Sequence, residues 1–372
     1  MQFKKVIGQK NVKANLIREA QTMKISHAQL FSGKSGFGTL PLALAFAQYL
    51  FCEQKNESDS CGECPACKKV EDLQHPDLHF VFPAVQTLSK VSDFFLKEWR
   101  AQIKETAYFN LHDWTLRMDD KERKPIIGTE ESKEIVRKLS LKSYEGGLKI
   151  MVIWMAEEMN AECANKLLKI LEEPPPSTLF FLISENPEKL LITIQSRTQL
   201  LRIPKIDTED LTQFLRTNLQ IDMSQAESIA AFAEGDLLNA LEFINADERK
   251  ELYREQFIKM MRSSYKKDVL GMMDWADEMS TLGKESQKLF MVYALHMFRQ
   301  SLIGNYLGTE MMRVSNEESA FLKNFAPFIT GNNIREFMQT FDEGYYHIDR
   351  NANARVLFTQ LCFQAMRYIH VA

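Results

Sequence analysis

The chain has 372 residues, of which 45% are hydrophobic and 26% are charged, and its formal net charge is −4. This composition is ordinary for a globular protein with a sizeable core, and the length predicts about two or three domains. The acidic balance argues against a protein that holds DNA alone by neutralising phosphates, so any DNA contact should be local or made within a larger assembly.

The N-terminal stretch MQFKKVIGQKNVKANL contains no apolar run suited to a signal peptide. No stretch approaches the roughly 18 apolar residues that a membrane-spanning helix needs. We therefore expect a cytoplasmic protein without a membrane partner, in which disulfides are disfavoured. The six cysteines then need another explanation.

Five short apolar runs occur in residues 1–204. Several are nearly continuous, which is typical of parallel strands buried on both faces. The runs are 27–32 (HAQLFS), 78–82 (LHFVF), 149–155 (KIMVIWM), 178–183 (TLFFLI) and 199–203 (QLLRI). Helical patterns lie between them, such as 41–50, which begins with proline, and 162–172, which three prolines stop. This alternation predicts an α/β domain with a parallel sheet.

The remaining segments favour helices. Residues 84–128 interrupt the α/β rhythm but are rich in aromatic side chains, so we interpret them as a packed helical insertion. Beyond Pro204 no strand pattern is convincing. Residues 205–246 are expected to form a small helical domain, and residues 247–372 a second one with apolar stripes. One such stripe consists of Leu289, Val292, Leu295, Phe298 and Leu302.

The first expected strand is followed by a glycine-rich loop, residues 33–40 (GKSGFGTL), which matches the phosphate-loop pattern G-x-x-x-x-G-K-[ST] only in part. Gly33 and Gly38 have the right spacing, but Thr39 stands at the lysine position and Leu40 at the hydroxyl position. The lysine would supply positive charge to the β- and γ-phosphates, and the hydroxyl would bind Mg²⁺. We therefore expect no bound ATP, although the glycines and the helix N-terminus could still hold an anion.

An active ATPase of this type also carries an Asp-Glu pair at the end of its third strand. Here that strand ends at Met155, and Glu157 and Glu158 follow shortly after. We interpret these two glutamates as solvated surface charges. The alternative is an active ATPase with an unorthodox site that uses Lys34 and one of these glutamates. Because three parts of the ATP machinery are missing together, we favour a protein without intrinsic ATPase activity.

Four closely spaced cysteines follow the pattern C-x8-C-x2-C-x2-C. They are Cys52, Cys61, Cys64 and Cys67. Four thiolates complete the tetrahedral shell of Zn²⁺ with no open position, as in structural rather than catalytic sites. The spacing predicts a zinc module over residues 52–67, with free thiols or disulfides as the alternative. Cys163 and Cys362 lie on helical apolar patterns and are expected in the core.

Two further stretches are similar to subunits of the bacterial clamp-loader family, which belongs to the AAA+ superfamily. One is 165–175 (NKLLKILEEPP); the other is 193–198 (TIQSRT), which resembles the family's Ser-Arg-Cys motif with threonine in place of cysteine. The similarity covers about residues 5–83 and 128–205. The loss of the ATP-binding residues suits a non-hydrolysing member better than an ATP-hydrolysing gamma/tau subunit.

The resemblance implies an architecture and a set of partners. The architecture is an AAA+-type parallel-sheet domain with a zinc module, a small helical lid domain and a C-terminal helical collar domain that holds subunits in a ring. The partners are gamma/tau-type ATPase subunits, a delta subunit, the sliding β clamp, and primed DNA within the complex. A free-standing zinc-containing DNA-binding module is a further alternative, which the acidic balance disfavours.

The resemblance also assigns a role to Arg197, the arginine of the Ser-Arg-Cys-like motif. In the family this arginine acts in trans on the ATP bound by the adjacent subunit, where a planar guanidinium stabilises developing negative charge. The alternative is an arginine that only pairs with a local carboxylate. The family's second sensor arginine should fall within residues 235–241, which contain no arginine.

Overall fold

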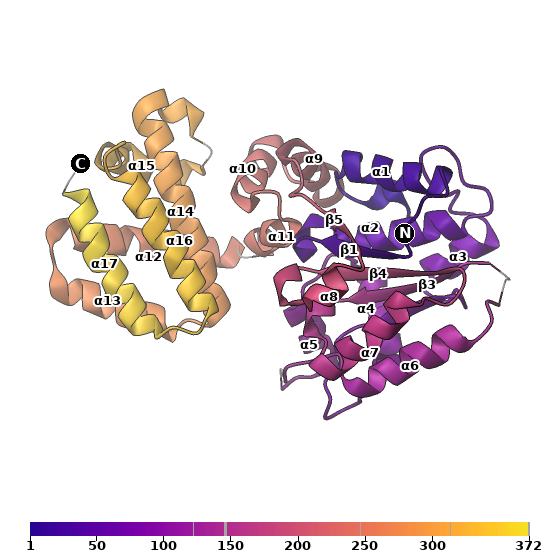
Figure 1. The fold of residues 1–372 in the computed structure, drawn as a ribbon. Helices are drawn as coiled ribbons and strands as arrows, with labels where there is room; N and C mark the ends of the chain where they lie inside the picture. Colours follow the sequence, from indigo (N-terminus) through magenta and orange to yellow (C-terminus); the bar gives the residue numbers. More distant parts are fainter. Residues whose placement is uncertain (122, 145–146, 246, 313, 371–372) are drawn as a thin grey trace. The chain divides into compact units, whose positions relative to one another are not determined.

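The computed structural model describes residues 1–121, 123–144, 147–245, 247–312 and 314–370 (Figure 1). The chain divides into two compact units, one comprising residues 1–220 and 233–239 and the other residues 221–232 and 240–372. Residues 205–246, expected as a separate lid domain, are shared between these units. Residue 246, at the expected boundary, lies outside the described residues. The three-domain division therefore stays a prediction.

The first unit is built on a five-stranded sheet with the order β2-β3-β4-β1-β5, in which every pair of neighbours is parallel (Figure 1). Each of the five apolar runs is confirmed as a strand. The strands are β1 (Ala28–Ser32), β2 (Leu78–Val81), β3 (Lys149–Trp154), β4 (Thr178–Ser184) and β5 (Gln199–Arg202). The expected parallel α/β fold is confirmed.

Both faces of the sheet are covered, which explains why its central strands are continuously apolar. Along β4, Leu179, Phe181 and Ile183 enter one hydrophobic core, and Phe180 and Leu182 enter the other. Helix α2 contributes to the first core, and helices α6 and α7 contribute to the second. The α-helices of this unit are α1 (Lys10–Gln21), α2 (Thr39–Phe51), α3 (Pro65–Glu71), α4 (Leu96–Glu105), α5 (Leu111–Met118), α6 (Thr129–Ser140), α7 (Ala161–Glu172), α8 (Ile192–Gln195) and α9 (Thr208–Leu219).

Residues that favour helix ends set the boundaries of two expected helices, α2 and α7. Helix α2 starts two residues before Pro41, after Gly38, whose φ of 91° lies in the left-handed region that favours glycine. Helix α7 starts after Asn160, whose side chain accepts a hydrogen bond of 2.8 Å from the Cys163 amide. It ends before the three prolines, which cannot continue a helix.

The insertion at residues 84–128 contains the packed helices α4 and α5, as expected. Trp99 of α4 stacks on Phe82 with ring centroids 4.2 Å apart, and it meets Trp114 of α5 edge-on at 5.2 Å. Phe109 contacts Trp154 of β3 at 4.9 Å. This aromatic cluster attaches the insertion to the sheet core.

The second unit is helical in its described residues, and its core is rich in aromatic side chains and methionines. Helices α10 (Met223–Ala233) and α11 (Leu237–Asn245) each contribute residues to both units. The following helices are α12 (Asp247–Lys266), α13 (Val269–Thr281), α14 (Lys284–Leu307), α15 (Asn316–Phe325), α16 (Ile334–Asp349) and α17 (Ala354–Ile369). No helix within the described ranges is long and apolar enough to cross a membrane.

Candidate metal centre and degenerate nucleotide site

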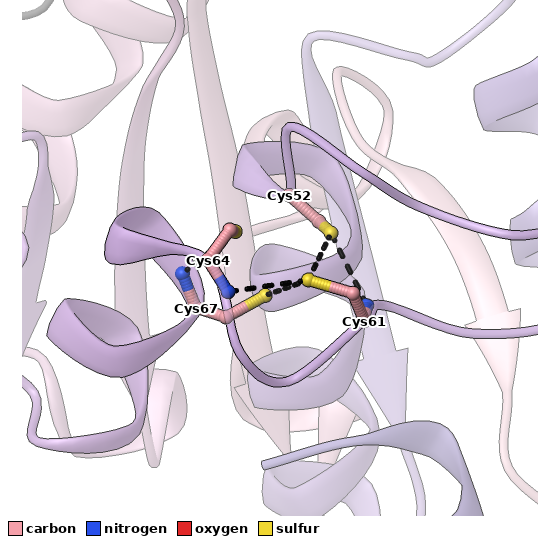
Figure 2. A group of neighbouring side chains, drawn as sticks. All are labelled: Cys52, Cys61, Cys64 and Cys67. Atoms are coloured by element: carbon pink, nitrogen blue, oxygen red, sulfur yellow. Dashed lines mark hydrogen bonds between the residues drawn. The ribbon is translucent and has the colours of Figure 1, made fainter.

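The four clustered cysteines converge on one point (Figure 2). Their sulfur atoms, from Cys52, Cys61, Cys64 and Cys67, all lie within 4.8 Å of one another. The Sγ atom of Cys61 is 3.5 Å from that of Cys52 and 3.9 Å from that of Cys67. A tetrahedral Zn²⁺ with Zn–S bonds of about 2.3 Å places its sulfurs roughly 3.8 Å apart. The residues therefore fit a tetrahedral four-thiolate metal site.

Helix ends and a tight turn position the four sulfurs. Cys52 follows the C-terminus of α2, and Cys64 is the N-cap of α3. Gly62, with φ of 77°, provides the left-handed turn between them. The amides of Glu63 and Cys64 donate to the Cys61 sulfur and lower the pKa of its thiol to about 6. Such donors favour the thiolate, which is the form that binds metals.

The cysteine module is anchored to the N-terminus of the chain. The Asp59 carboxylate accepts hydrogen bonds of 3.0 Å from the amides of Phe3 and Lys4. Gln2 donates through Nε2 to the Ser60 carbonyl at 2.7 Å. The other two cysteines behave as expected: Cys163 and Cys362 are buried in hydrophobic cores and are not members of the cluster.

The degenerate phosphate loop lies between β1 and α2, as the motif requires. Thr39 is only 1% exposed and Leu40 only 2%, so the side chains at the two key positions pack inward. Lys34 projects into solvent, with its Nζ atom 3.9 Å from Asp236 Oδ2. Nothing in this arrangement places Lys34 over the loop glycines as a substitute for the missing lysine.

The interpretation of Glu157 and Glu158 as solvated surface charges is wrong. Glu157 Oε1 accepts hydrogen bonds from the amides of Glu185 at 2.8 Å and Asn186 at 3.1 Å, and burial raises the pKa of Glu157. Glu158 is largely buried and pairs with Lys124 at 3.3 Å. Both glutamates follow β3 in a 3₁₀ turn (Ala156–Glu158), which directs Glu157 against the backbone beyond β4 instead of into water.

Arg197 lies just after α8 and makes two local contacts. Its Nη2 atom is 2.6 Å from Glu172 Oε1 at the end of α7, and its Nη1 atom donates to the Thr193 carbonyl at 3.0 Å. The local ion pair considered as the alternative is therefore present. The role in trans stays a prediction. Thr198, which replaces the motif's cysteine, donates through Oγ1 to the Ile194 carbonyl at 3.1 Å.

Sequence reasoning missed three carboxylates at these sites. Glu172 belongs to a stretch that was noted for its resemblance alone, and Glu185 follows β4 without any local signal. Asp236 directly precedes α11, a position where aspartate commonly caps a helix, so a capping pattern could have identified it.

The sheet of five parallel strands and the glycine-rich loop between its strand β1 and α2 define an α/β protein with a degenerate phosphate loop. Within that class the chain belongs to the family described as DNA polymerase III, delta subunit, whose sequence model matches residues 8–207. The expected resemblance to clamp-loader subunits is thereby confirmed.

Individual relatives agree with this family. The chain is 35% identical over 178 residues to the DNA polymerase III subunit delta′ of Bacillus subtilis (strain 168), covering 48% of this chain and 42% of that protein. It is 25% identical over 291 residues to subunit delta′ of Buchnera aphidicola subsp. Schizaphis graminum, covering 74% and 77%. Subunit tau/gamma of Haemophilus influenzae is 25% identical over 244 residues, covering 64% of this chain and 30% of that protein. The first and third matches thus span less than half of the relative.

Proposed function

We propose that this chain is a non-hydrolysing delta′-type subunit of the DNA polymerase III clamp loader, which helps to load the sliding β clamp on primed DNA. The single observation that carries the proposal is the combination of family membership with Thr39 and Leu40 at the positions of the catalytic lysine and the metal-binding hydroxyl. Neither side chain supplies a cation or a Mg²⁺ ligand, so the chain would act on the ATP of a gamma/tau-type neighbour.

In this proposal Arg197 is the group that reaches the neighbour's ATP. A guanidinium has five N–H donors in a fixed fork, and the two local contacts of Arg197 leave several of them available. Its side chain is 35% exposed, and the exposed ion pair with Glu172 costs little to break. Arginines that act in this way accelerate phosphoryl transfer by about 10³–10⁵-fold.

The cysteine cluster is proposed to hold a structural Zn²⁺. Its four sulfurs leave no coordination position for substrate, and the observed spacings match a tetrahedral thiolate shell. The metal would fix the end of α2 to the start of α3 and would take no part in chemistry. The delta subunit, the β clamp and primed DNA are proposed as partners of the assembly, because a net charge of −4 disfavours DNA binding by this chain alone.

Reconstitution with gamma/tau-type and delta subunits, β clamp and primed DNA tests the proposal. Arg197→Ala should lower ATP turnover of the complex, with a loss at the neighbouring site on the order of 10³-fold, while assembly measured by gel filtration stays intact. Arg137→Ala is the matched control, because Arg137 forms a similar arginine–glutamate pair with Glu134 on the surface of α6. Unchanged turnover in Arg197→Ala would remove the trans-acting role.

The rival enzyme hypothesis has its own test. If the purified chain hydrolysed ATP alone, and if Glu158→Ala abolished that hydrolysis, the chain would be an active ATPase. We expect no such hydrolysis, because Glu158 is engaged with Lys124 and the lysine of the phosphate loop is missing.

A further inference from the structure

The backbone of the degenerate phosphate loop is closed by hydrogen bonds within the chain. In a nucleotide-binding loop of this type, successive amides point at the phosphates. Here residues Ser35–Phe37 form a 3₁₀ turn. The Phe37 amide donates to the Lys34 carbonyl at 3.0 Å, and the Gly38 amide donates to the Ser35 carbonyl at 3.1 Å. These amides are therefore committed to the turn instead of being free for a ligand.

A third amide of the loop, that of Ser35, is bound by a carboxylate. Ser35 N donates to Glu185 Oε1 at 2.7 Å, a short, charge-assisted hydrogen bond. Glu185 follows the last residue of β4, and its own amide is held by Glu157 at 2.8 Å. Glu157 thus fixes the backbone from which Glu185 reaches the loop.

A second carboxylate lies on the same loop. Asp236 is buried, and its Oδ1 atom is so close to Gly36 that a Cβ atom added at that glycine would overlap it. The same oxygen accepts from the Leu238 amide at 3.1 Å, which holds the carboxylate at the start of α11. Lys34 lies 3.9 Å from the other oxygen. Burial raises the pKa of Asp236, and the charge of Lys34 acts in the opposite direction.

Two buried hydroxyls of the loop, the Oγ atom of Ser35 and the Oγ1 atom of Thr39, have no hydrogen-bond partner among the described residues. Buried polar atoms are normally satisfied, so unpartnered ones at a loop with an anion-binding shape require an explanation. A phosphate group would supply acceptors for both.

We infer that the phosphate loop is a latent anion site, which Glu185 and Asp236 fill from within the chain in place of nucleotide phosphates. Glu185 takes the amide hydrogen bond that a phosphate oxygen would accept, and Asp236 occupies the space against Gly36 that a phosphate would need. Two acidic groups at the loop also repel any further anion. The inference rests on the proposed function, in which the chain hydrolyses no ATP, and deepens it by giving a reason why this subunit would bind no nucleotide.

The test removes from the full chain the two carboxylates that occupy the loop. The double variant Glu185→Ala/Asp236→Ser removes both carboxylates, and serine keeps a hydroxyl that can cap α11. The matched control is Glu188→Ala/Asp207→Ser, which removes two exposed acids from the same unit, one of them at the N-cap of α9 without a capping hydrogen bond. Binding of inorganic pyrophosphate is measured by calorimetry without divalent ions, with adenosine as a probe that lacks phosphates.

The opened variant should bind pyrophosphate at least roughly tenfold more tightly than the wild type and the control variant, and none of the three should bind adenosine. Equal affinity of the wild type and a folded opened variant would overturn the inference, and so would an opened variant that binds no pyrophosphate. If the variant does not fold, crystals of the wild type are soaked in pyrophosphate as a second test. The carboxylates of Glu185 and Asp236 should then keep their positions on the loop. A pyrophosphate bound to the Ser35 amide would overturn the inference. Since no partner subunit is used, failure here is distinct from an unchanged turnover in Arg197→Ala.

Discussion

A single ion pair decides how Arg197, the residue proposed to act in trans, is oriented in the free chain. Arg197 is held by Glu172, but the two side chains are 35% and 48% exposed, and such ion pairs contribute at most about 1 kcal/mol. This pair can orient the guanidinium in the free chain without preventing it from reaching a phosphate on another subunit. A buried pair would instead have made Arg197 a structural residue.

This weak restraint makes a prediction for Glu172→Gln. In the reconstituted complex, ATP turnover should change by no more than about fivefold, since about 1 kcal/mol is the most that the exposed pair can contribute. Turnover assays of Glu172→Gln and Arg197→Ala side by side check this, with Glu134→Gln as the control for a comparable surface pair. A loss as large as that of Arg197→Ala would mean that Glu172 is required to position the arginine.

Another prediction concerns the cysteine that starts α3. Cys64→Ser should abolish stoichiometric zinc binding, measured by elemental analysis, because three thiolates no longer complete the shell. It should also lower the midpoint of thermal unfolding, since metal binding contributes to folding free energy. Cys163→Ser is the matched control: it changes a buried cysteine outside the cluster and should keep the metal. A zinc-free wild-type protein would contradict the prediction.

At the scale of elements, the insertion shows how an extra segment is accommodated in an α/β unit. Its helices contribute to the hydrophobic core on one face of the sheet, through the ring contacts of Trp99 with Phe82, Trp114 and Phe109. The segment therefore adds buried apolar area and is part of the fold rather than an appended loop.

This packing predicts unequal effects for two aromatic residues of the insertion. Trp99 is fully buried, so Trp99→Ala should lower the free energy of unfolding by about 3–5 kcal/mol. Phe94 is 67% exposed, so Phe94→Ala should change it by roughly 0.5 kcal/mol or less. Denaturant unfolding followed by circular dichroism distinguishes the two, and equal losses would contradict the packing described.

At the scale of the whole molecule, the chain has two compact units with separate hydrophobic cores. The first holds the sheet, the cysteine cluster and the phosphate loop, and the second is a helical bundle in its described part. Because each hydrophobic core lies within its own unit, a destabilising substitution in one core should lower mainly the stability of that unit.

Phe298→Ala tests this separation, because Phe298 is fully buried in the core of the second unit. The substitution should lower the midpoint of one calorimetric transition by several degrees. The transition of the first unit, identified as the one whose midpoint shifts when zinc is removed, should keep its midpoint. A single transition that responds equally to both changes would show that the two units unfold together.

Local patterns in the sequence determined the strands and the cysteine cluster of this protein. Four of the five apolar runs became buried strands because buried parallel strands require apolar residues on both faces, whereas the fifth, β5, is largely exposed. The cysteine spacing predicted the convergent sulfurs because two helix ends and the tight turn at Gly62 bring such positions together. The stripe on α14 was less informative: Phe298 is buried, but Leu289, Val292, Leu295 and Leu302 are only half-buried. The most buried face of this helix is formed by other residues, among them Phe290, Met291, Ala294 and Met297.

Only the tertiary structure decided which backbone groups the buried carboxylates contact. The Glu185 carboxylate and the Ser35 amide are 150 positions apart in the chain, and Asp236 is 200 positions from Gly36. Glu157 was misplaced for the same reason, since its amide partners belong to the segment after the neighbouring strand. Periodicity and capping report on neighbours within a turn or two of the chain. An electrostatic contact between distant segments exists only once the sheet order has brought their ends to the same edge.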